Sequence, residues 1–357
     1  MITTLRPVII GSILVLAGVV QAHAEVVLRY AEGGPNRGVR AAAVQYYADE
    51  VERLSAGDIK IDIHWGGALL KWSGALDGIA AGSADLGSVL SSYEPQELKA
   101  LGIGDIPLEY ADPWVGMRAM YDLMTGEPEL QKSLADQSLV YLSNFSTTGV
   151  QFECTEGKQI LSVDDIKGKR IRAAGTYTNV LSELGADTVS MTFGEVYQAL
   201  DSGLVDCLAS YFYTMRAYKT YEVVETVTRV DWGQLLGFAI VMNEYVWSDF
   251  DEEQKSILRQ AGKNMIDYFA ELTIADAGEV AKNLSNGGFG KVVPVTAIDP
   301  AERQKILDAT LPFRDSWIEE ANRRGMQGQA IWDHYIELLK TYQAELESQG
   351  YPWEAAQ

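Results

Sequence analysis

The sequence predicts an α/β fold in two lobes that one long helix braces. Short strand-like segments alternate with amphipathic helical segments, an order typical of parallel sheets wrapped by helices. The chain of 357 residues is longer than a single hydrophobic core usually serves. A helical pattern from Asp251 to about Asn286 would be about 52 Å long, which exceeds the width of one lobe.

The first 24 residues have the pattern of a secretory signal peptide. Arg6 precedes an apolar run from Pro7 to Val20, and Ala22 and Ala24 form an A-x-A cleavage site. The run is shorter than the roughly 20 residues that a membrane-spanning helix needs. We expect export, cleavage near Ala24 and a mature chain that begins near Glu25. An uncleaved membrane anchor is the alternative.

The first part of the mature chain alternates strands and helices. Apolar residues recur at three- and four-residue spacing from Val39 to Leu54, which predicts an amphipathic helix with Asn36 as its cap. A turn bracketed by glycines carries Lys71 and Trp72. We expect strands at residues 26–30, 59–63 and 86–90 and helices at residues 39–54 and 76–80.

The remainder of the chain repeats the alternation and then becomes helical. We expect strands at residues 139–142, 150–152, 169–173, 204–208, 238–242 and 292–293, and helices at residues 178–184, 193–200, 251–286, 300–325 and 330–348. This order predicts a first lobe of residues 25–148 and 238–277 and a second lobe of residues 149–237 and 278–329. Residues 330–357 are expected to form a C-terminal helix that packs on the lobes.

The charge of the chain argues against two classes of partner. The formal net charge is −21, and it becomes −22 once residues 1–24 are removed, because Arg6 is their only charged residue. Such a surface repels nucleic acid and anionic lipid. We therefore expect no nucleic-acid partner. The net charge says little about a small ligand, which interacts with the few charges inside its pocket.

Recognisable catalytic motifs are missing. Of three histidines, His23 lies in the signal segment, and His64 and His334 are far apart in sequence. The sequence contains no H-E-x-x-H, G-x-S-x-G, C-x-x-C or phosphate-binding loop. We therefore predict no catalytic residues, no cofactor and no metal site. A two-carboxylate hydrolase stays open as an alternative, because 50 acidic residues make chance pairs inevitable.

Cys154 and Cys207 are the only cysteines. In an oxidising compartment a lone pair more often forms a disulfide than a reactive thiol. Two cysteines are also too few for a closed structural zinc site. We expect a disulfide that stabilises the fold by roughly 4 kcal/mol in the chain-entropy model. Two free buried thiols are the alternative.

The segment from Val163 to Tyr218 resembles a known family. It contains VDDIKGKRIRAAG, then LGA, then SMTFGEVYQALDSGLVDC. This is similar to the pattern DLKGxKIR, LGA and PMxFxEVYxALQxGxVDG of the DctP-type substrate-binding proteins of tripartite ATP-independent periplasmic (TRAP) transporters. Flanking segments agree, with AGSADL at residues 81–86 and NEYVWSDFDEEQKSILRQA at residues 243–261.

The resemblance implies a two-lobed periplasmic binding protein fold with a ligand cleft between the lobes. It implies a periplasmic receptor that captures a small organic anion for the membrane subunits of a TRAP transporter, and we expect a monomer. By the match of the KIR strand, Arg172 is the residue that pairs with the ligand carboxylate. Arg172 also ends a strand at the edge where open α/β sheets bind ligands, and its planar fork suits a carboxylate. The neighbouring Arg170 is interpreted as a surface charge.

Other candidate ligand contacts come from the match and from its departures. Phe193 stands at an aromatic position of the family's cleft. Ser210 stands where the family has an asparagine, and Tyr211 follows it. From the other lobe Asn36, Lys71 and Trp72 would close on the ligand, and Trp232 precedes a strand that crosses between the lobes. These residues, with Arg172, are the candidate ligand-binding set.

The second arginine that many members carry near residues 150–153 is missing here. A simple C4-dicarboxylate assignment is therefore weakened, unless Lys71 replaces that arginine. Monocarboxylates, keto acids, aromatic acids and sulfonates all fit one arginine and many aromatic rings. The alternatives for function are the binding protein of an ATP-driven transporter, a periplasmic sensor subunit and a periplasmic enzyme.

Overall fold

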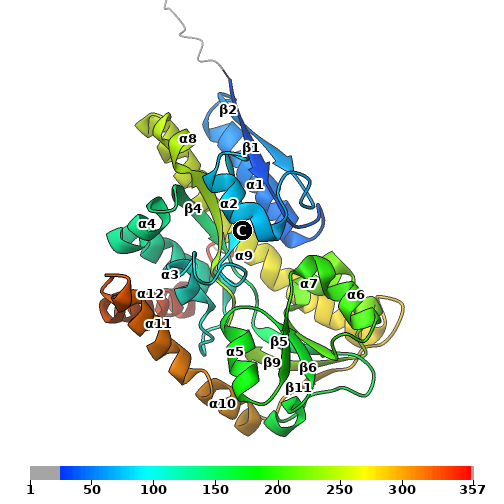
Figure 1. Cartoon of the computed structure of the whole chain (residues 1–357). Coiled ribbons are helices and arrows are strands. Elements are labelled where there is room, and N and C mark those ends of the chain that lie inside the picture. The colour runs from blue at the N-terminus through cyan, green and yellow to red at the C-terminus, as the bar shows by residue number, and fades with distance from the viewer. Residues whose placement is uncertain (1–24, 355–357) are drawn as a thin grey trace, which may run out of the picture.

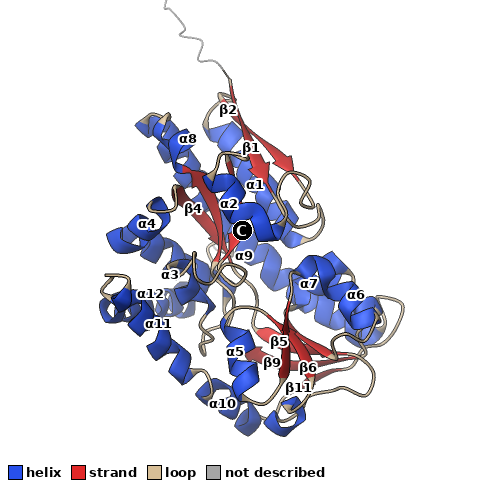
Figure 2. Ribbon diagram, viewed as in Figure 1, coloured by secondary structure: helices blue, strands red, loops and turns tan. Residues whose placement is uncertain are grey.

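The computed structural model describes residues 25–354 and contains two β-sheets with helices packed around them (Figures 1 and 2). One sheet has the strand order β2-β1-β3-β10-β4, and the other has the order β11-β9-β5-β8-β6-β7. The first sheet lies at the top of Figure 1 and the second at the bottom, each within its own lobe. The predicted α/β fold in two lobes is confirmed.

The sheet of the first lobe joins parallel strands from the start of the chain to two later strands. β1 pairs in parallel with β2 and β3, whereas β10 runs antiparallel to both β3 and β4. All six residues of β10 are buried, as expected for a strand with a neighbour on each side. The strands are β1 (Val26–Ala31), β2 (Ile59–His64), β3 (Leu86–Leu90), β4 (Leu139–Phe145) and β10 (Phe238–Asn243).

The sheet of the second lobe is also mixed. β6 pairs in parallel with β7 and β8, β11 pairs in parallel with β9, and β5 runs antiparallel to β8 and β9. The strands are β5 (Val150–Cys154), β6 (Arg170–Ala173), β7 (Asp187–Ser190), β8 (Cys207–Ser210), β9 (Thr226–Trp232) and β11 (Val295–Ala297). β11 replaces the strand expected at residues 292–293. Val293 is instead buried, and its N–H donates to the Leu284 carbonyl.

Helices cover both sheets. They are α1 (Val39–Leu54), α2 (Ala75–Ala80), α3 (Pro113–Gly126), α4 (Pro128–Ala135), α5 (Thr176–Glu183), α6 (Val196–Asp201), α7 (Phe212–Tyr218), α8 (Glu244–Ser248), α9 (Glu252–Asn286), α10 (Pro300–Asp308), α11 (Leu311–Arg323) and α12 (Gly328–Gln349). The predicted cap of α1 is wrong, because Gly38 occupies the N-cap with φ 84° and Asn36 is an exposed residue outside the helix. Among the described residues, no helix has the length and apolar character to cross a membrane.

The long helix α9 is confirmed, with 35 residues. Its N-terminus is closed by a reciprocal capping box between Asp251 and Gln254, and its C-terminus by Gly287 at φ 79°. α9 packs against α1, α3 and β4 of the first lobe and against α7 and β11 of the second. It therefore contacts both lobes, as a bracing helix should.

The C-terminal helices divide between the lobes. α10 packs on β9, and Arg303 Nε donates to the Val230 carbonyl at 2.8 Å. α11 contacts both lobes, because Phe313 packs against the core of the second lobe and Trp317 Nε1 donates to the Lys99 carbonyl of the first lobe at 3.1 Å. α12 packs on α3 of the first lobe. The expected helix at residues 300–325 is two helices, because the chain turns before Pro312.

Candidate functional site

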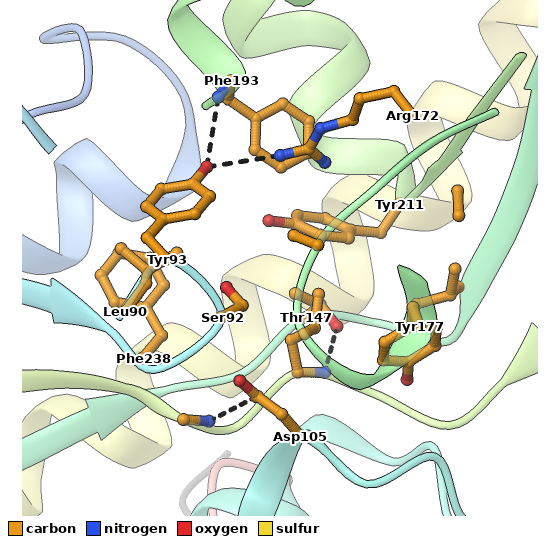
Figure 3. Close-up of a pocket in the computed structure, with 15 residues that line it drawn as sticks. Leu90, Ser92, Tyr93, Asp105, Thr147, Arg172, Tyr177, Phe193, Tyr211 and Phe238 are labelled. Atoms are coloured by element: carbon orange, nitrogen blue, oxygen red, sulfur yellow. Dashed lines mark hydrogen bonds between the residues drawn. The ribbon is translucent and has the colours of Figure 1, made fainter. Parts of the chain in front are cut away.

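A cavity lies between the two lobes, at the ends of β3, β6 and β8 and the start of β10 (Figure 3). Its volume is about 20 Å³, so the lobes approach closely around it. Arg172 and Phe193 lie at one end of the cavity, and Asp105 and Thr147 lie at the other. The lining residues are Leu90, Ser92, Tyr93, Asp105, Thr147, Val150, Arg172, Ala174, Tyr177, Phe193, Ala209, Tyr211, Leu235, Gly237 and Phe238. We call this cavity the first chamber.

The guanidinium of Arg172 is the cationic group of the first chamber. Its side chain is buried, with 2% exposure for the residue. Nε and Nη2 both donate to the Met191 carbonyl, at 3.0 and 2.7 Å, and Nη2 also donates to the Tyr93 hydroxyl at 3.5 Å. These acceptors are neutral, and no described carboxylate lies within ion-pair distance of Arg172. A buried cation with only neutral partners favours an anionic ligand.

Aromatic rings form the walls around this cation. The Arg172 guanidinium carbon lies 4.2 Å from the centroid of Phe193, a cation–π contact. Phe193 also stacks on Tyr218 at 5.3 Å and meets Tyr211 edge-on at 5.6 Å. A capping box between Thr192 and Glu195 holds the short 3₁₀ turn Phe193–Glu195 that carries the ring. Flat walls of this kind suit a planar or apolar ligand body.

Tyr93 connects the two lobes at the cavity. It follows β3 in the first lobe, and its hydroxyl accepts a hydrogen bond from the Phe193 N–H at 3.1 Å as well as the longer one from Arg172 (Figure 3). On the same boundary, Arg37 Nε donates to the Ala217 carbonyl at 2.7 Å. These contacts join the lobes and hold the cleft shut.

Two buried carboxyl groups lie near the cavity. Burial raises the pKa of Asp105 to about 6, although its Oδ1 accepts hydrogen bonds from the N–H groups of Leu236 and Gly237 at 3.0 and 2.8 Å. Burial also raises the pKa of Glu153 to about 8, against the opposing field of Arg172. Glu153 is therefore mostly protonated at neutral pH, so it leaves the positive charge of Arg172 largely uncompensated.

Four of the eight candidate residues line this region. Arg172, Phe193 and Tyr211 line the first chamber, and Trp72 lines an adjoining cavity that shares Phe193 and Tyr211 with it. Arg172 lies in β6, Phe193 lies in the 3₁₀ turn before α6, and Tyr211 directly follows β8, whereas Trp72 comes from the first lobe. Tertiary folding therefore brings these residues close to Arg172, the predicted partner of the ligand carboxylate.

The other four candidates lie elsewhere. Ser210 alternates with Ala209 and Tyr211, so it faces away from the chamber, where its hydroxyl lies 2.9 Å from that of Thr214. Trp232 is fully buried behind the wall, 4.8 Å from the ring of Tyr177.

Lys71 and Asn36 are exposed and line neither cavity. In this closed arrangement neither side chain reaches the surroundings of Arg172.

Several lining residues were missed by the sequence analysis. They are Asp105, Tyr177 and Phe238 in the first chamber and Arg40 in the adjoining cavity. Arg40 lies within the predicted helix at residues 39–54, where its charge alone predicts a position on the exposed face of an amphipathic helix. No local pattern distinguishes it, because its burial depends on packing against Trp72 and Phe238, which are distant in sequence.

The two cysteines and Arg170 behave as expected. Cys154 and Cys207 form a disulfide that joins the paired strands β5 and β8. Arg170 is half-exposed, and its Nη2 lies 2.7 Å from Oδ1 of Asp206. Hydrogen bonding from Arg170 holds the pKa of Asp206 well below its usual range. Arg170 therefore has a structural partner, whereas its strand neighbour Arg172 has none of opposite charge.

Comparison with known proteins agrees with this architecture. Residues 31–320 match the family of bacterial extracellular solute-binding proteins, family 7, designated DctP. A solute-binding protein of Albidiferax ferrireducens is 25% identical over 269 residues, which are 72% of this chain and 75% of that protein.

Two solved structures are similar over most of the chain. A TRAP periplasmic solute-binding protein from Desulfovibrio salexigens is 25% identical with a TM-score of 0.74, covering 92% of this chain and 98% of that one. A TRAP solute-binding protein from Rhodoferax ferrireducens, in complex with copurified benzoate, has a TM-score of 0.79 and covers 89% of this chain and 99% of that one. The latter is 17% identical, so it shows a shared fold alone.

Proposed function

The chain belongs to family 7 of the bacterial extracellular solute-binding proteins, the DctP family, and we propose that it captures a small organic acid for the membrane subunits of a TRAP-type transporter. Members of this family are receptors that bind solutes. Among organic acids, we propose a ligand with one carboxylate and a planar or apolar body. The observation that carries the proposal is the buried Arg172, whose hydrogen-bond acceptors are all neutral.

The charge of the cleft supports a ligand with a single carboxylate. The free face of the Arg172 guanidinium can meet a carboxylate with charge-assisted hydrogen bonds. The first chamber offers no second cation to a second carboxylate, because Arg172 is the only basic residue in its lining. Phe193, Tyr211 and Phe238 supply apolar surface for the ligand body. Benzoate, found in the Rhodoferax relative, is an acid of this kind.

Ligand capture requires the lobes to move. The chamber is too small and too enclosed to load in the closed form, so the ligand enters when the lobes are apart. It then contacts both lobes only after closure, and these differential contacts shift the population toward the closed form. The closed surface is what the membrane subunits would recognise. We place the receptor in the periplasm, exported by a signal peptide within residues 1–24, which lie outside the described residues.

The test measures binding of organic acids to the mature chain by isothermal titration calorimetry and thermal shift. We expect monocarboxylates such as benzoate to bind and to raise the melting temperature. Arg172→Gln should abolish this shift, and Arg170→Gln, on the same strand but paired with Asp206, should retain it. Retention of full affinity by Arg172→Gln in a folded protein would overturn the proposal.

A further inference from the structure

A second chamber adjoins the first on the boundary between the lobes. It is lined by Arg37, Val39, Arg40, Trp72, Leu90, Tyr93, Phe193, Tyr211, Tyr213, Thr214, Ala217, Tyr218 and Phe238. Five of these residues, Leu90, Tyr93, Phe193, Tyr211 and Phe238, also line the first chamber. The two chambers therefore share a wall formed by these side chains, and the second lies in the direction in which a ligand anchored on Arg172 could extend.

A buried ion pair adjoins the second chamber, with Arg40 in its lining and Glu32 behind Arg40. Nη1 of Arg40 lies 2.5 Å from Oε2 of Glu32, and the side chains are 8% and 0% exposed. Glu32 is held in place by two further donors, the Gly34 N–H at 2.6 Å and the Ser88 hydroxyl at 2.8 Å. A side chain at Gly34 would displace the Arg40 guanidinium, because a Cβ there would occupy its space. The pair is thus built into the first lobe.

The Arg40 guanidinium is also enclosed by rings. Its central carbon lies 5.3 Å from the centroids of both Trp72 and Phe238. Across the chamber, Tyr213 and Tyr218 of α7 are close enough for Arg40 to affect the ionisation of their hydroxyls. Nη1 of Arg40 is engaged by Glu32, and no hydrogen bond from Nε or Nη2 occurs within the described residues, so these two nitrogens remain available to a ligand oxygen.

The two buried guanidiniums therefore differ in charge balance. Arg172 has neutral partners, whereas the charge of Arg40 is cancelled by Glu32. A carboxylate placed beside Arg40 would lie next to the Glu32 carboxylate, and these three buried groups together would carry a net negative charge. Arg37, the other cation of the lining, is exposed to solvent, and its guanidinium donates to the Ala217 carbonyl. Burying such a charge without its own cation is costly. A neutral oxygen can accept a hydrogen bond from Arg40 without that cost.

We infer that the second chamber is a specificity subsite that accepts a neutral polar substituent of the ligand, such as a hydroxyl, oxo or amide oxygen, and that the Glu32–Arg40 pair excludes a second carboxylate. The inference rests on the proposed function, because it takes the acid on Arg172 as its starting point. It assigns the ligand to the class of monocarboxylates with a neutral polar group distant from the acid. Glu32 is the residue that enforces the exclusion.

The test compares benzoate, its 3- and 4-hydroxy derivatives and the matching benzenedicarboxylates by calorimetry on the mature chain. We expect the wild type to bind a hydroxybenzoate at least as tightly as benzoate and each dicarboxylate at least tenfold more weakly. Glu32→Gln keeps one acceptor oxygen for the Gly34 N–H, and its NH2 group can donate to the Ser88 hydroxyl, but it frees the charge of Arg40. It should improve dicarboxylate binding at least tenfold and change benzoate binding less than threefold.

Glu50→Gln is the matched control, since Glu50 pairs with Arg53 in the same lobe and lines neither chamber. The inference would be overturned if folded Glu32→Gln kept the wild-type selectivity for benzoate over the dicarboxylates. It would also be overturned if the wild type preferred dicarboxylates. If circular dichroism shows that Glu32→Gln is unfolded, the wild type decides: a dicarboxylate bound within tenfold of benzoate overturns the inference. Failure of every aromatic acid to bind the wild type would instead refute the proposed ligand class.

Discussion

The hydroxyl of Tyr93 in the first lobe lies 3.1 Å from the backbone nitrogen of Phe193 in the second lobe. This hydrogen bond spans the cleft directly beside the Arg172 guanidinium, which also donates to the same hydroxyl. It can form only when the lobes are closed. Tyr93 therefore links closure of the lobes to the residue that we propose holds the ligand.

Removing this hydroxyl should weaken the closed state without unfolding the protein. One hydrogen bond contributes about 0.5–1.5 kcal/mol, so Tyr93→Phe should weaken ligand affinity about threefold to tenfold, mainly through faster dissociation. Stopped-flow fluorescence and calorimetry measure both quantities. Tyr197→Phe, which removes a hydroxyl bonded to Glu222 away from the cleft, is the control. An unchanged dissociation rate for Tyr93→Phe would show that the contact does not stabilise closure.

The buried Glu153 should make binding depend on pH. Burial raises the pKa of Glu153 to about 8, so the carboxyl is neutral below that pH and ionises above it, near Arg172. Asp105, in the chamber lining, ionises near pH 6, so the effect of Glu153 is the fall in carboxylate affinity that we expect between pH 7 and pH 9. Glu153→Gln should remove the fall, as calorimetry between pH 6 and pH 9 would show. An equal fall in the variant would assign the effect to another group.

The same carboxyl should affect stability with a defined sign. Because its folded-state pKa exceeds its unfolded value, the folded protein loses stability as the pH rises from about 4.5 to about 8. Glu153→Gln should therefore raise the melting temperature at pH 9 relative to the wild type and have less effect at pH 5. Differential scanning calorimetry at the two values tests this. A larger benefit at pH 5 would contradict the assignment.

The ion pair between Asp206 and Arg170 should affect stability with the opposite pH dependence. Arg170 holds the pKa of Asp206 below its usual range, so the pair stabilises the fold above about pH 4 and less as the pH falls further. We expect Asp206→Asn to lower the melting temperature by a few degrees at pH 7 and by much less at pH 2. Ligand affinity at pH 7 should be retained, because Asp206 lines neither chamber.

The disulfide should contribute substantially to stability but not to recognition. Cys154 and Cys207 join β5 and β8 across a separation of 53 residues. In the chain-entropy model the double variant Cys154→Ser/Cys207→Ser loses roughly 4 kcal/mol of unfolding free energy. Urea denaturation measures the loss, and a reducing agent should destabilise the wild type to a similar degree. A variant as stable as the oxidised wild type would contradict this.

The sequence by itself determined the features that depend on neighbouring residues. Strand alternation, helical periodicity and a local motif were enough to predict two lobes, the long helix and the end of β6 where Arg172 lies. Phe193 and Tyr211 follow in the same motif, and both line the first chamber. The disulfide was predictable because the chain has only two cysteines.

Tertiary structure alone decided which of the remaining side chains face the cleft. Ser210 and Tyr211 are adjacent in sequence but point to opposite sides of β8, and only Tyr211 reaches the chamber. Tyr93 and Arg40 belong to the first lobe, and they meet the arginine motif only because the two lobes close on each other. No local pattern contains that information, because burial, and with it the energetic cost of each charge, is set by contacts between segments distant in the chain.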